Sequence, residues 1–410
     1  MTRALRLARA LTPMALALCM GACGTTEAPR SSGAGRSLMP GSLAVLASDY
    51  RSTNVALRDP AGVRLTPSIL STASASAGVS FALSGDVVLP SEPRGVGEEL
   101  VLIDRYGTNV LTFVDTVSGR VRAQLPVGTG FESNPQDFLT LDAGRALVAR
   151  FGVDPRPGDV ALDGGDDVLV VDTETPALVR RVVLPRKEGT PARPGALTPF
   201  GGKVYVNLHR LAADFDRAVD ADVAVLDGRT GELERVVALP GLRNCGKPVF
   251  SQDGLMATAC SGLFDPARAR FDDVGAAVVV GTLVDGAFRE RERWSASAIG
   301  ATPTGSVAWL GEGRIVASLF GSAGRGDAVV DLALGATAPR EIHRSTSPFT
   351  LGAIRCSRGA AFLCAMPDAS SSVIVGFSLG FSDAGAPTEV RAILAPDITG
   401  LPLRDLAFFR

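Results

Sequence analysis

The sequence predicts an all-β protein. Short runs rich in Val, Leu and Ala alternate with Gly, Asp and Pro, whereas stretches with helical periodicity are scarce. The 410 residues include 46 Gly and 26 Pro, which favours many turns, and 46% of them are hydrophobic, which is enough to build a large core. Similar segments recur along the chain, so we expect one strand-and-turn unit to be repeated.

The chain opens with the layout of a secretory signal peptide. Arg3, Arg6 and Arg9 precede an apolar run from Leu11 to Ala22, and small residues come directly before Cys23. This run is too short for a permanent transmembrane helix. We therefore expect residues 1–22 to be a signal peptide and the mature protein to begin at Cys23.

The segment Met20-Gly21-Ala22-Cys23 resembles a bacterial lipobox. The resemblance implies cleavage before Cys23 and acylation of its thiol and new amino group, with palmitate among the chains. Two or more acyl chains anchor a protein stably to a membrane. An ordinary secreted protein with a chance Cys is the alternative. By resemblance to the sorting rules of enteric bacteria, Gly24 directs such a lipoprotein to the outer membrane.

The lipidated Cys and the residues after it, 23–41, form a predicted flexible tether because they are rich in Gly, Ser and Pro. Beyond the tether, one motif of strand, tight turn and strand occurs seven times. Segments that each predict a strand, a turn and a second strand separate these copies, for example 134–152, 247–262 and 305–321. The seven copies are 42–70, 99–128, 166–185, 221–240, 276–294, 327–345 and 371–394.

This spacing gives about four strands in roughly 50 residues, which is typical of propeller blades. We therefore predict that residues 42–410 form a seven-bladed β-propeller of four-stranded antiparallel blades. We expect the strand near 43–48 to complete the blade made by the C-terminus, which would close the ring. The Asp residues of the turns, such as Asp172 and Asp227, are expected to cap those turns through nearby backbone groups.

Two segments of the middle copies resemble a known repeat family. Two stretches of sequence resemble the YVTN-type β-propeller repeat. They are "VYVN" followed by "ADVAVLDGRTGELERVVALP", and "LVARFG" followed by "DDVLVVDTETPALVRRVVLP". The resemblance covers residues 42–410 in patches and is strongest from about 99 to 262. It supports the propeller architecture and implies little about function.

The cysteines fit export to an oxidising compartment. A turn over 251–254 would place Phe250 opposite Leu255 and Cys245 opposite Cys260, close enough for a disulfide. We predict this bond, with two buried free thiols as the alternative. The sequence leaves open whether Cys356 and Cys364 are bonded.

The middle copies share unusually long connections at the same phase of the repeat. A closed propeller would send these connections to one rim, and long loops on a rigid scaffold often bind ligands. We therefore expect this rim to bind a protein or glycan of the cell envelope, with solvated loops and weak mutual ion pairs as the alternative. The candidate binding residues are Arg150, Asp154, Arg156, His209, Arg210, Asp214, Phe215, Asp216, Asp265 and Arg268.

An enzyme is the alternative function. His209 could act as a general base beside Asp214 or Asp216, but the sequence contains no G-x-S-x-G, H-E-x-x-H or P-loop motif. Acidic groups at Asp163, Asp166 and Asp167, or Asp214, Asp216 and Asp220, could bind calcium but do not fit the EF-hand pattern.

We therefore expect no cofactor, metal or catalytic residue. A net charge of −2 provides no basic surface for nucleic acid. Under the enzyme alternative, a periplasmic hydrolase or lactonase would have its site in the central funnel.

Overall fold

The computed structural model describes residues 38–410 except 76, 143, 268–269, 323, 337, 358–363, 382–386 and 397–399. The predicted signal peptide, Cys23 and most of the predicted tether therefore lie outside the described residues. No helix in the described part is long and apolar enough to cross a membrane.

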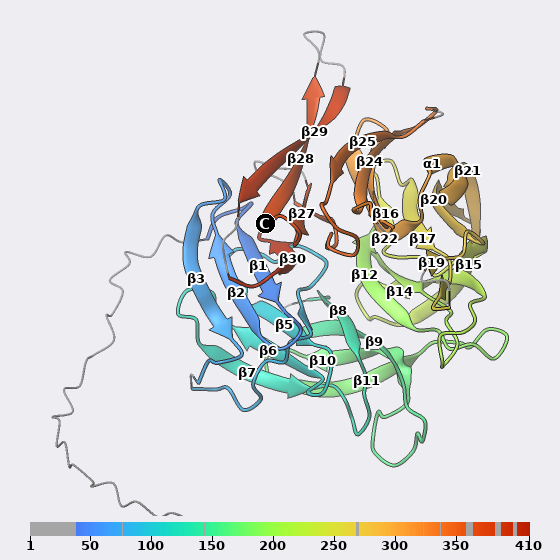
Figure 1. The fold of residues 1–410 in the computed structure, drawn as a ribbon. Helices are drawn as coiled ribbons and strands as arrows, with labels where there is room; N and C mark the ends of the chain where they lie inside the picture. Colours follow the sequence, from blue (N-terminus) through green and yellow to red (C-terminus); the bar gives the residue numbers. More distant parts are fainter. Residues whose placement is uncertain are drawn as a thin grey trace, which may run out of the picture. The chain divides into compact units, whose positions relative to one another are not determined.

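The described residues form seven four-stranded antiparallel sheets, which confirms the predicted seven-bladed β-propeller. The blades are arranged around a common centre (Figure 1). In blades 2 to 7 the four strands follow one another in sequence from the innermost outwards, apart from a small hairpin inserted into blade 5.

Each of the first four blades takes its outer strands from one repeated segment. Blade 1 consists of β30 (Leu403–Phe408), β1 (Leu43–Ser48), β2 (Thr53–Arg58) and β3 (Arg64–Ser71); blade 2 of β4 (Val87–Val88), β5 (Leu100–Asp104), β6 (Val110–Val114) and β7 (Val121–Pro126); blade 3 of β8 (Pro135–Thr140), β9 (Arg145–Val153), β10 (Gly165–Asp172) and β11 (Ala177–Val183); and blade 4 of β12 (Pro194–Phe200), β13 (Lys203–Leu208), β14 (Asp220–Asp227) and β15 (Leu233–Arg243).

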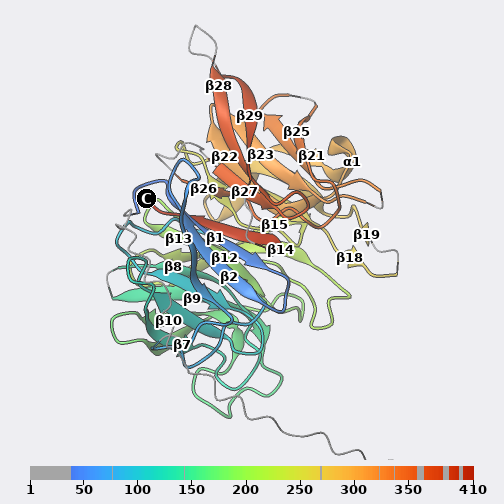
Figure 2. The same ribbon diagram turned by 60° about the vertical axis from the view of Figure 1, so that its left-hand side comes forward.

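The last three blades keep this arrangement, although their sequences match the repeat less closely. In blade 7, β28 and β29 extend beyond the neighbouring blades (Figure 2). Blade 5 consists of β16 (Val249–Phe250), β17 (Met256–Ser261), β20 (Ala276–Val284) and β21 (Ala287–Ser295), with the hairpin β18 (Phe264–Asp265) and β19 (Arg270–Phe271) and the helix α1 (Ala296–Ile299); blade 6 of β22 (Pro303–Gly311), β23 (Arg314–Leu319), β24 (Ala328–Ala333) and β25 (Arg340–Arg344); and blade 7 of β26 (Arg355–Cys356), β27 (Cys364–Asp368), β28 (Val373–Phe381) and β29 (Pro387–Pro396).

The turns between the outer strands form as the sequence predicts. Asp227 accepts backbone hydrogen bonds from Arg229 (3.0 Å) and Thr230 (2.8 Å), and Asp172 accepts one from Thr175 (2.8 Å). These bonds to Thr230 and Arg229 lower the pKa of Asp227 to about 2. Gly231, at φ +71°, supplies the left-handed backbone conformation that completes the same turn.

The hydrophobic core lies between the blades. It divides into seven clusters of buried residues, and each cluster joins two consecutive blades, including blade 7 with blade 1. This arrangement explains why the middle strands are buried on both faces and read as nearly continuous Val, Leu and Ala. Each blade packs one face against the preceding blade and the other against the next.

A belt of polar contacts joins the inner strands. Asp137 on β8 accepts hydrogen bonds from the backbone N–H groups of Ser91 and Leu197, both at 2.8 Å, and so links blades 2, 3 and 4. Asp405 on β30 accepts from the Leu89 N–H (3.0 Å) and from Arg355 (3.2 Å), and so links blades 2, 1 and 7. Both carboxylates are buried, so the inner ring depends on these partners.

Ring closure joins the two ends of the propeller domain. The C-terminal strand β30 pairs antiparallel with β1, from Leu43 opposite Phe408 to Ala47 opposite Leu403. The predicted pairing of residues 43–48 with the C-terminal part of the chain is therefore correct. The contribution is the reverse of the one expected, because β30 completes a blade made of three N-terminal strands.

Both pairs of cysteines form disulfides. Cys245 lies opposite Cys260 and is bonded to it, as predicted. The predicted register of the hairpin tip is wrong by one residue, because Phe250 pairs with Met256 and not with Leu255. The irregular stretch between Cys245 and β16 absorbs the difference. Cys356 and Cys364, which the sequence left open, also face each other and are bonded.

We predict that deleting residues 403–410 destabilises the whole ring. The deletion removes the inner strand of blade 1 and exposes the core that joins blades 7 and 1. The point variant Phe408→Ala should lower the free energy of unfolding by about 3–5 kcal/mol, since this ring is fully buried. Val117→Ala, at an exposed turn, should change it by less than about 0.5 kcal/mol. Thermal and denaturant unfolding measure both effects, and a truncated protein that melts like the full-length one would contradict this account of closure.

We predict that replacing Cys245 and Cys260 together by Ala lowers the free energy of unfolding by about 3 kcal/mol, because the bond closes a loop of 15 residues in the unfolded chain. Replacing Cys356 and Cys364 should cost slightly less, since that loop spans only 8 residues. Denaturant unfolding measures both variants. A reducing agent should destabilise the native protein but not a variant lacking all four cysteines.

Candidate functional site

The long connections lie on one face of the propeller, which we call the loop face. The inner strand of each blade starts at this face, so the connections between second and third strands must return to it. Those connections include residues 154–164, 209–219, 262–275 and 320–327. The connections from each outer strand to the next blade reach the same face.

Arg150 is buried beneath the loop face. The sequence analysis expected it at the binding surface, but its side chain is not exposed there. Its guanidinium makes two hydrogen bonds of 2.8 Å to Asp167 and three more to Thr129, Val127 and Leu162. All five donors of this side chain are therefore used. Arg150 binds the 154–164 connection to the preceding blade, so it supports the loop face and cannot contact a partner.

Arg210 has the same position in blade 4, and its burial also contradicts the expectation that it faces a partner. It donates to Asp222 and to the carbonyl oxygen of Pro185, both at 2.6 Å. The sequence contained a signal for this role, because in both blades an Arg near the end of the second strand is followed by an Asp near the start of the third.

Arg193 is a buried residue of the loop face that the sequence analysis missed. It donates to the carbonyl oxygens of Leu211, Ala212 and Ala213 at 3.0–3.1 Å. Its guanidinium also lies 4.9 Å from the ring centre of Phe151 and 4.4 Å from that of Phe215. Arg193 therefore holds the connection of blade 4 against the end of β9 in blade 3.

His209 is half-buried, and its two nitrogens bond Asn244 (2.7 Å) and Asn207 (3.0 Å). Its hydrogen-bond partners are these amides, not Asp214 or Asp216 as the general-base alternative required. Burial lowers the pKa of His209, and the cation of Arg193 adds to this effect, so the ring is neutral at pH 7. Both nitrogens being engaged, His209 acts here as a positioning residue for Asn207 and Asn244.

The remaining predicted residues occupy the surface of the loop face. Asp154 caps its own loop by accepting from the Arg156 N–H (2.8 Å), and Asp265 accepts from the Ala267 N–H (2.9 Å). Arg268 lies outside the described residues. The residues exposed to solvent are Arg156, Asp214, Phe215 and Asp216.

In the first acidic group considered for calcium, each of the three carboxylates is bonded to other partners. Asp163 accepts from the backbone of its own loop, Asp166 from the Ala192 and Arg193 N–H groups, and Asp167 from Arg150. Within the described ranges, no three His, Cys, Asp or Glu side chains are grouped so that they could hold a metal ion.

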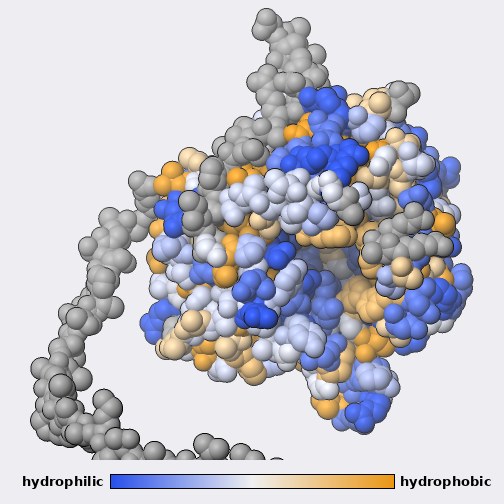
Figure 3. Space-filling view, viewed as in Figure 1, coloured by the Kyte–Doolittle hydropathy of each residue, from blue (hydrophilic) through white to orange (hydrophobic). Residues whose placement is uncertain are grey.

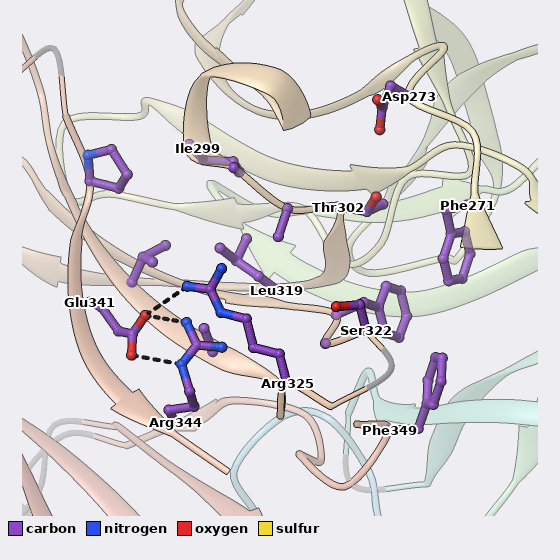
Figure 4. A pocket seen from close by; sticks show the side chains of 17 residues that line it. Phe271, Asp273, Ile299, Thr302, Leu319, Ser322, Arg325, Glu341, Arg344 and Phe349 are labelled. Carbon is purple, nitrogen blue, oxygen red and sulfur yellow. Dashed lines mark hydrogen bonds and ion pairs between the residues drawn. The ribbon is translucent and has the colours of Figure 1, made fainter. Parts of the chain in front are cut away.

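A cavity of about 650 Å³ on the loop face lies over blades 5 and 6, and we call it the loop-face pocket (Figure 4). On one side Glu341 pairs with Arg344 (2.9 Å) and Arg325 (3.7 Å). The bond from Arg344, together with the charge of Arg325, lowers the pKa of Glu341, so the carboxylate is ionised at neutral pH.

The other side of the loop-face pocket is a row of phenylalanine rings from three connections. Phe271 stacks on Phe320 with ring centres 4.4 Å apart, and Phe320 lies 5.5 Å from Phe349. Phe264 extends the row at 5.1 Å from Phe271. Phe349 is 55% exposed, so part of the row is open to solvent.

One buried carboxylate holds the end of this row in place. Asp327, at the start of β24, accepts from four backbone N–H groups at 2.7–3.1 Å: Gly321, Phe349, Thr350 and Leu351. It therefore fixes the connection that carries Phe320 against the one that carries Phe349. This pocket was not predicted from the sequence, although a Phe-Gly pair occurs at the end of the second strand in blade 3 and directly after it in blade 6.

A second cavity, of about 250 Å³, lies where the inner strands of blades 7, 1, 2 and 3 begin, and we call it the channel mouth. It opens at the centre of the ring on the loop face and is lined by Arg105, Arg355, Arg404, Asp86 and Asp405. The face drawn in Figure 3 is hollowed near its middle and mixes hydrophilic with hydrophobic residues.

No protein-family model matches the sequence, and no curated protein matches it. Solved structures resemble the fold. A protein from Lactobacillus plantarum has a TM-score of 0.57 at 12% identity, with 91% of this chain and 100% of that chain covered. A putative 6-phosphogluconolactonase from Bacteroides fragilis has a TM-score of 0.54 at 11% identity over 90% and 98%. The periplasmic gluconolactonase of Pseudomonas aeruginosa has 0.51 at 15% identity over 90% and 99%. At these identities the likeness shows the propeller fold alone.

We predict that Arg150→Met lowers the free energy of unfolding by about 3–5 kcal/mol, because it leaves the buried Asp167 carboxylate without its main partner. The same change at exposed Arg156, in the connection that Arg150 supports, should cost less than about 0.5 kcal/mol. Denaturant unfolding of the two variants makes the comparison. Equal stability of the two would mean that Arg150 does not support the loop face.

Proposed function

We propose that the protein is a lipid-anchored binding module of the bacterial cell envelope, a scaffold that holds a protein or glycan on its loop face. The loop-face pocket is the observation that carries this proposal. It combines a large concave surface, partly exposed aromatic rings and charged groups on rigidly held connections. Binding sites of globular proteins commonly share these properties.

The two sides of the loop-face pocket offer different chemistry to a partner. The rings of Phe264, Phe271, Phe320 and Phe349 provide an apolar strip, and aromatic rings contribute strongly to interfaces. Arg325, whose side chain is 63% exposed, and Glu341 provide donors and acceptors that can exchange their mutual ion pair for bonds to a partner. An exposed ion pair of this kind costs little to open.

The proposed anchor rests on the sequence alone. The lipobox ending at Cys23 would attach the chain to a membrane, in our proposal the outer membrane, and residues 24–41 would act as the tether. As a flexible coil, these 18 residues would span roughly 24 Å. The propeller could then reach partners beside the membrane surface.

The test is affinity capture from cross-linked envelopes with the native protein and with the double variant Phe349→Ala/Arg325→Ala. We expect the native protein to capture a defined envelope protein or glycan and the double variant to lose at least about 90% of it, since interface residues of this kind carry about 1–2 kcal/mol each. Val117→Ala is the matched control, because Val117 is exposed at a turn of the opposite face. Equal capture by the native protein and the double variant would refute the loop-face proposal.

A lactone hydrolase is the second candidate. Charged residues gather at the channel mouth, and two of the structural neighbours are named a putative 6-phosphogluconolactonase and a periplasmic gluconolactonase. This candidate predicts hydrolysis of glucono-lactone above the spontaneous rate, with activity lost when Asp86 or Asp405 is replaced by Asn. A rate equal to the spontaneous one would remove it.

A further inference from the structure

We propose that the channel mouth binds a small molecule through a carboxylate or phosphate group. This site is separate from the loop-face pocket and does not depend on the binding function proposed for that pocket. It rests on three arginines that consecutive blades direct to one cavity.

The three arginines come from different parts of the sequence. Arg355 lies on β26 of blade 7, Arg404 on β30 of blade 1, and Arg105 directly after β5 of blade 2. Arg355 and Arg404 lie where an inner strand starts, and Arg105 lies where a second strand ends, so all three reach the loop-face end of the channel. Only the closed ring brings blades 7, 1 and 2 together.

The charges at the channel mouth do not balance. Arg105 pairs with Asp86, and Arg355 pairs with Asp405 at 3.1 Å. Arg404 has no carboxylate partner among the described residues, so the five charged groups of the lining carry a net charge of +1. Asp405 also accepts a hydrogen bond from the Leu89 N–H. Its negative charge is therefore shared between Arg355 and a backbone donor of blade 2. The cavity consequently favours an anion.

Arg404 is held ready for such a ligand. Its guanidinium lies 4.5 Å from the ring centre of Tyr50, and its Nε donates to the Ser48 carbonyl oxygen (3.1 Å). Its two terminal nitrogens make no hydrogen bond to a described residue. A guanidinium fixed by stacking and one hydrogen bond loses little freedom on binding, and its free edge suits a carboxylate or phosphate.

The neighbouring arginines also have unused donors. The Nε atoms of Arg105 and Arg355 are buried without a hydrogen-bond partner in the described structure. Unsatisfied buried donors are rare in proteins and call for an explanation. A shift of these side chains towards a bound anion would give them partners.

The size and openings of the cavity limit the ligand. A volume of about 250 Å³ is below the range for drug-sized ligands, so it fits a small molecule rather than a polymer. Past the end of β4, Glu92 (2.5 Å) and the Ser91 carbonyl oxygen (3.0 Å) accept hydrogen bonds from Lys247 of blade 5 across the channel. The ligand would therefore enter from the loop face.

The test is calorimetric titration of the intact propeller protein with three probes: inorganic phosphate, gluconate and glucose. We expect phosphate or gluconate to bind with a Kd below about 1 mM and glucose, which has no charge, not to bind in this range. Binding of phosphate alone would identify a phosphate-bearing ligand, and binding of gluconate alone a carboxylate. Higher salt should weaken binding, because it screens the arginine charges.

Arg404→Gln should weaken anion binding at least about tenfold, since it removes the charge-assisted hydrogen bonds of the unpaired guanidinium. Arg120→Gln is the matched control: it removes the same charge at an exposed turn of the opposite face and should leave the affinity unchanged. Thermal unfolding shows whether each variant is folded. No binding of either anion, or equal affinity of Arg404→Gln and the native protein, would overturn the proposal. Neither result would affect capture of a partner by the loop-face pocket.

Discussion

The structure depends on the antiparallel pairing of β30 with β1. Every blade buries both faces against its neighbours, so an open ring would expose the inner faces of two blades at once. Closing the ring with a C-terminal strand inside an N-terminal blade makes the two ends of the domain mutually dependent. The cores between the blades then form one continuous circle, and no blade can lose its packing without affecting the next.

Buried charged residues stabilise the ring of blades both at the inner strands and at the loop face. Asp137 and Asp405 join inner strands of neighbouring blades, whereas Arg150, Arg210 and Asp327 fix the long connections to the blades below. A buried charge is stable only with its partners in place. These residues therefore give the loop face a defined shape, which a set of long solvated loops would not have by itself.

Two cavities of different character share the loop face. The loop-face pocket is wide, partly aromatic and nearly balanced in charge, which suits a large partner. The channel mouth is small, lies at the centre of the ring and carries an excess of positive charge, which suits a small anion. The same scaffold could thus hold a partner at its rim and a small molecule at its centre, and the two sites can be tested separately.

The sequence by itself determined the strands, the seven blades, the turn-capping role of Asp172 and Asp227, and the disulfide between Cys245 and Cys260, because each depends on local patterns of alternation, turn and spacing. It also placed the long connections on one face. Only the tertiary structure decided which of their side chains are exposed: Arg150 and Arg210 turn inwards, whereas Phe349 and Arg325 line a pocket. It also decided that Arg105, Arg355 and Arg404 meet. These residues belong to separate blades, and their proximity follows from the order of blades in a closed ring, which no local pattern encodes.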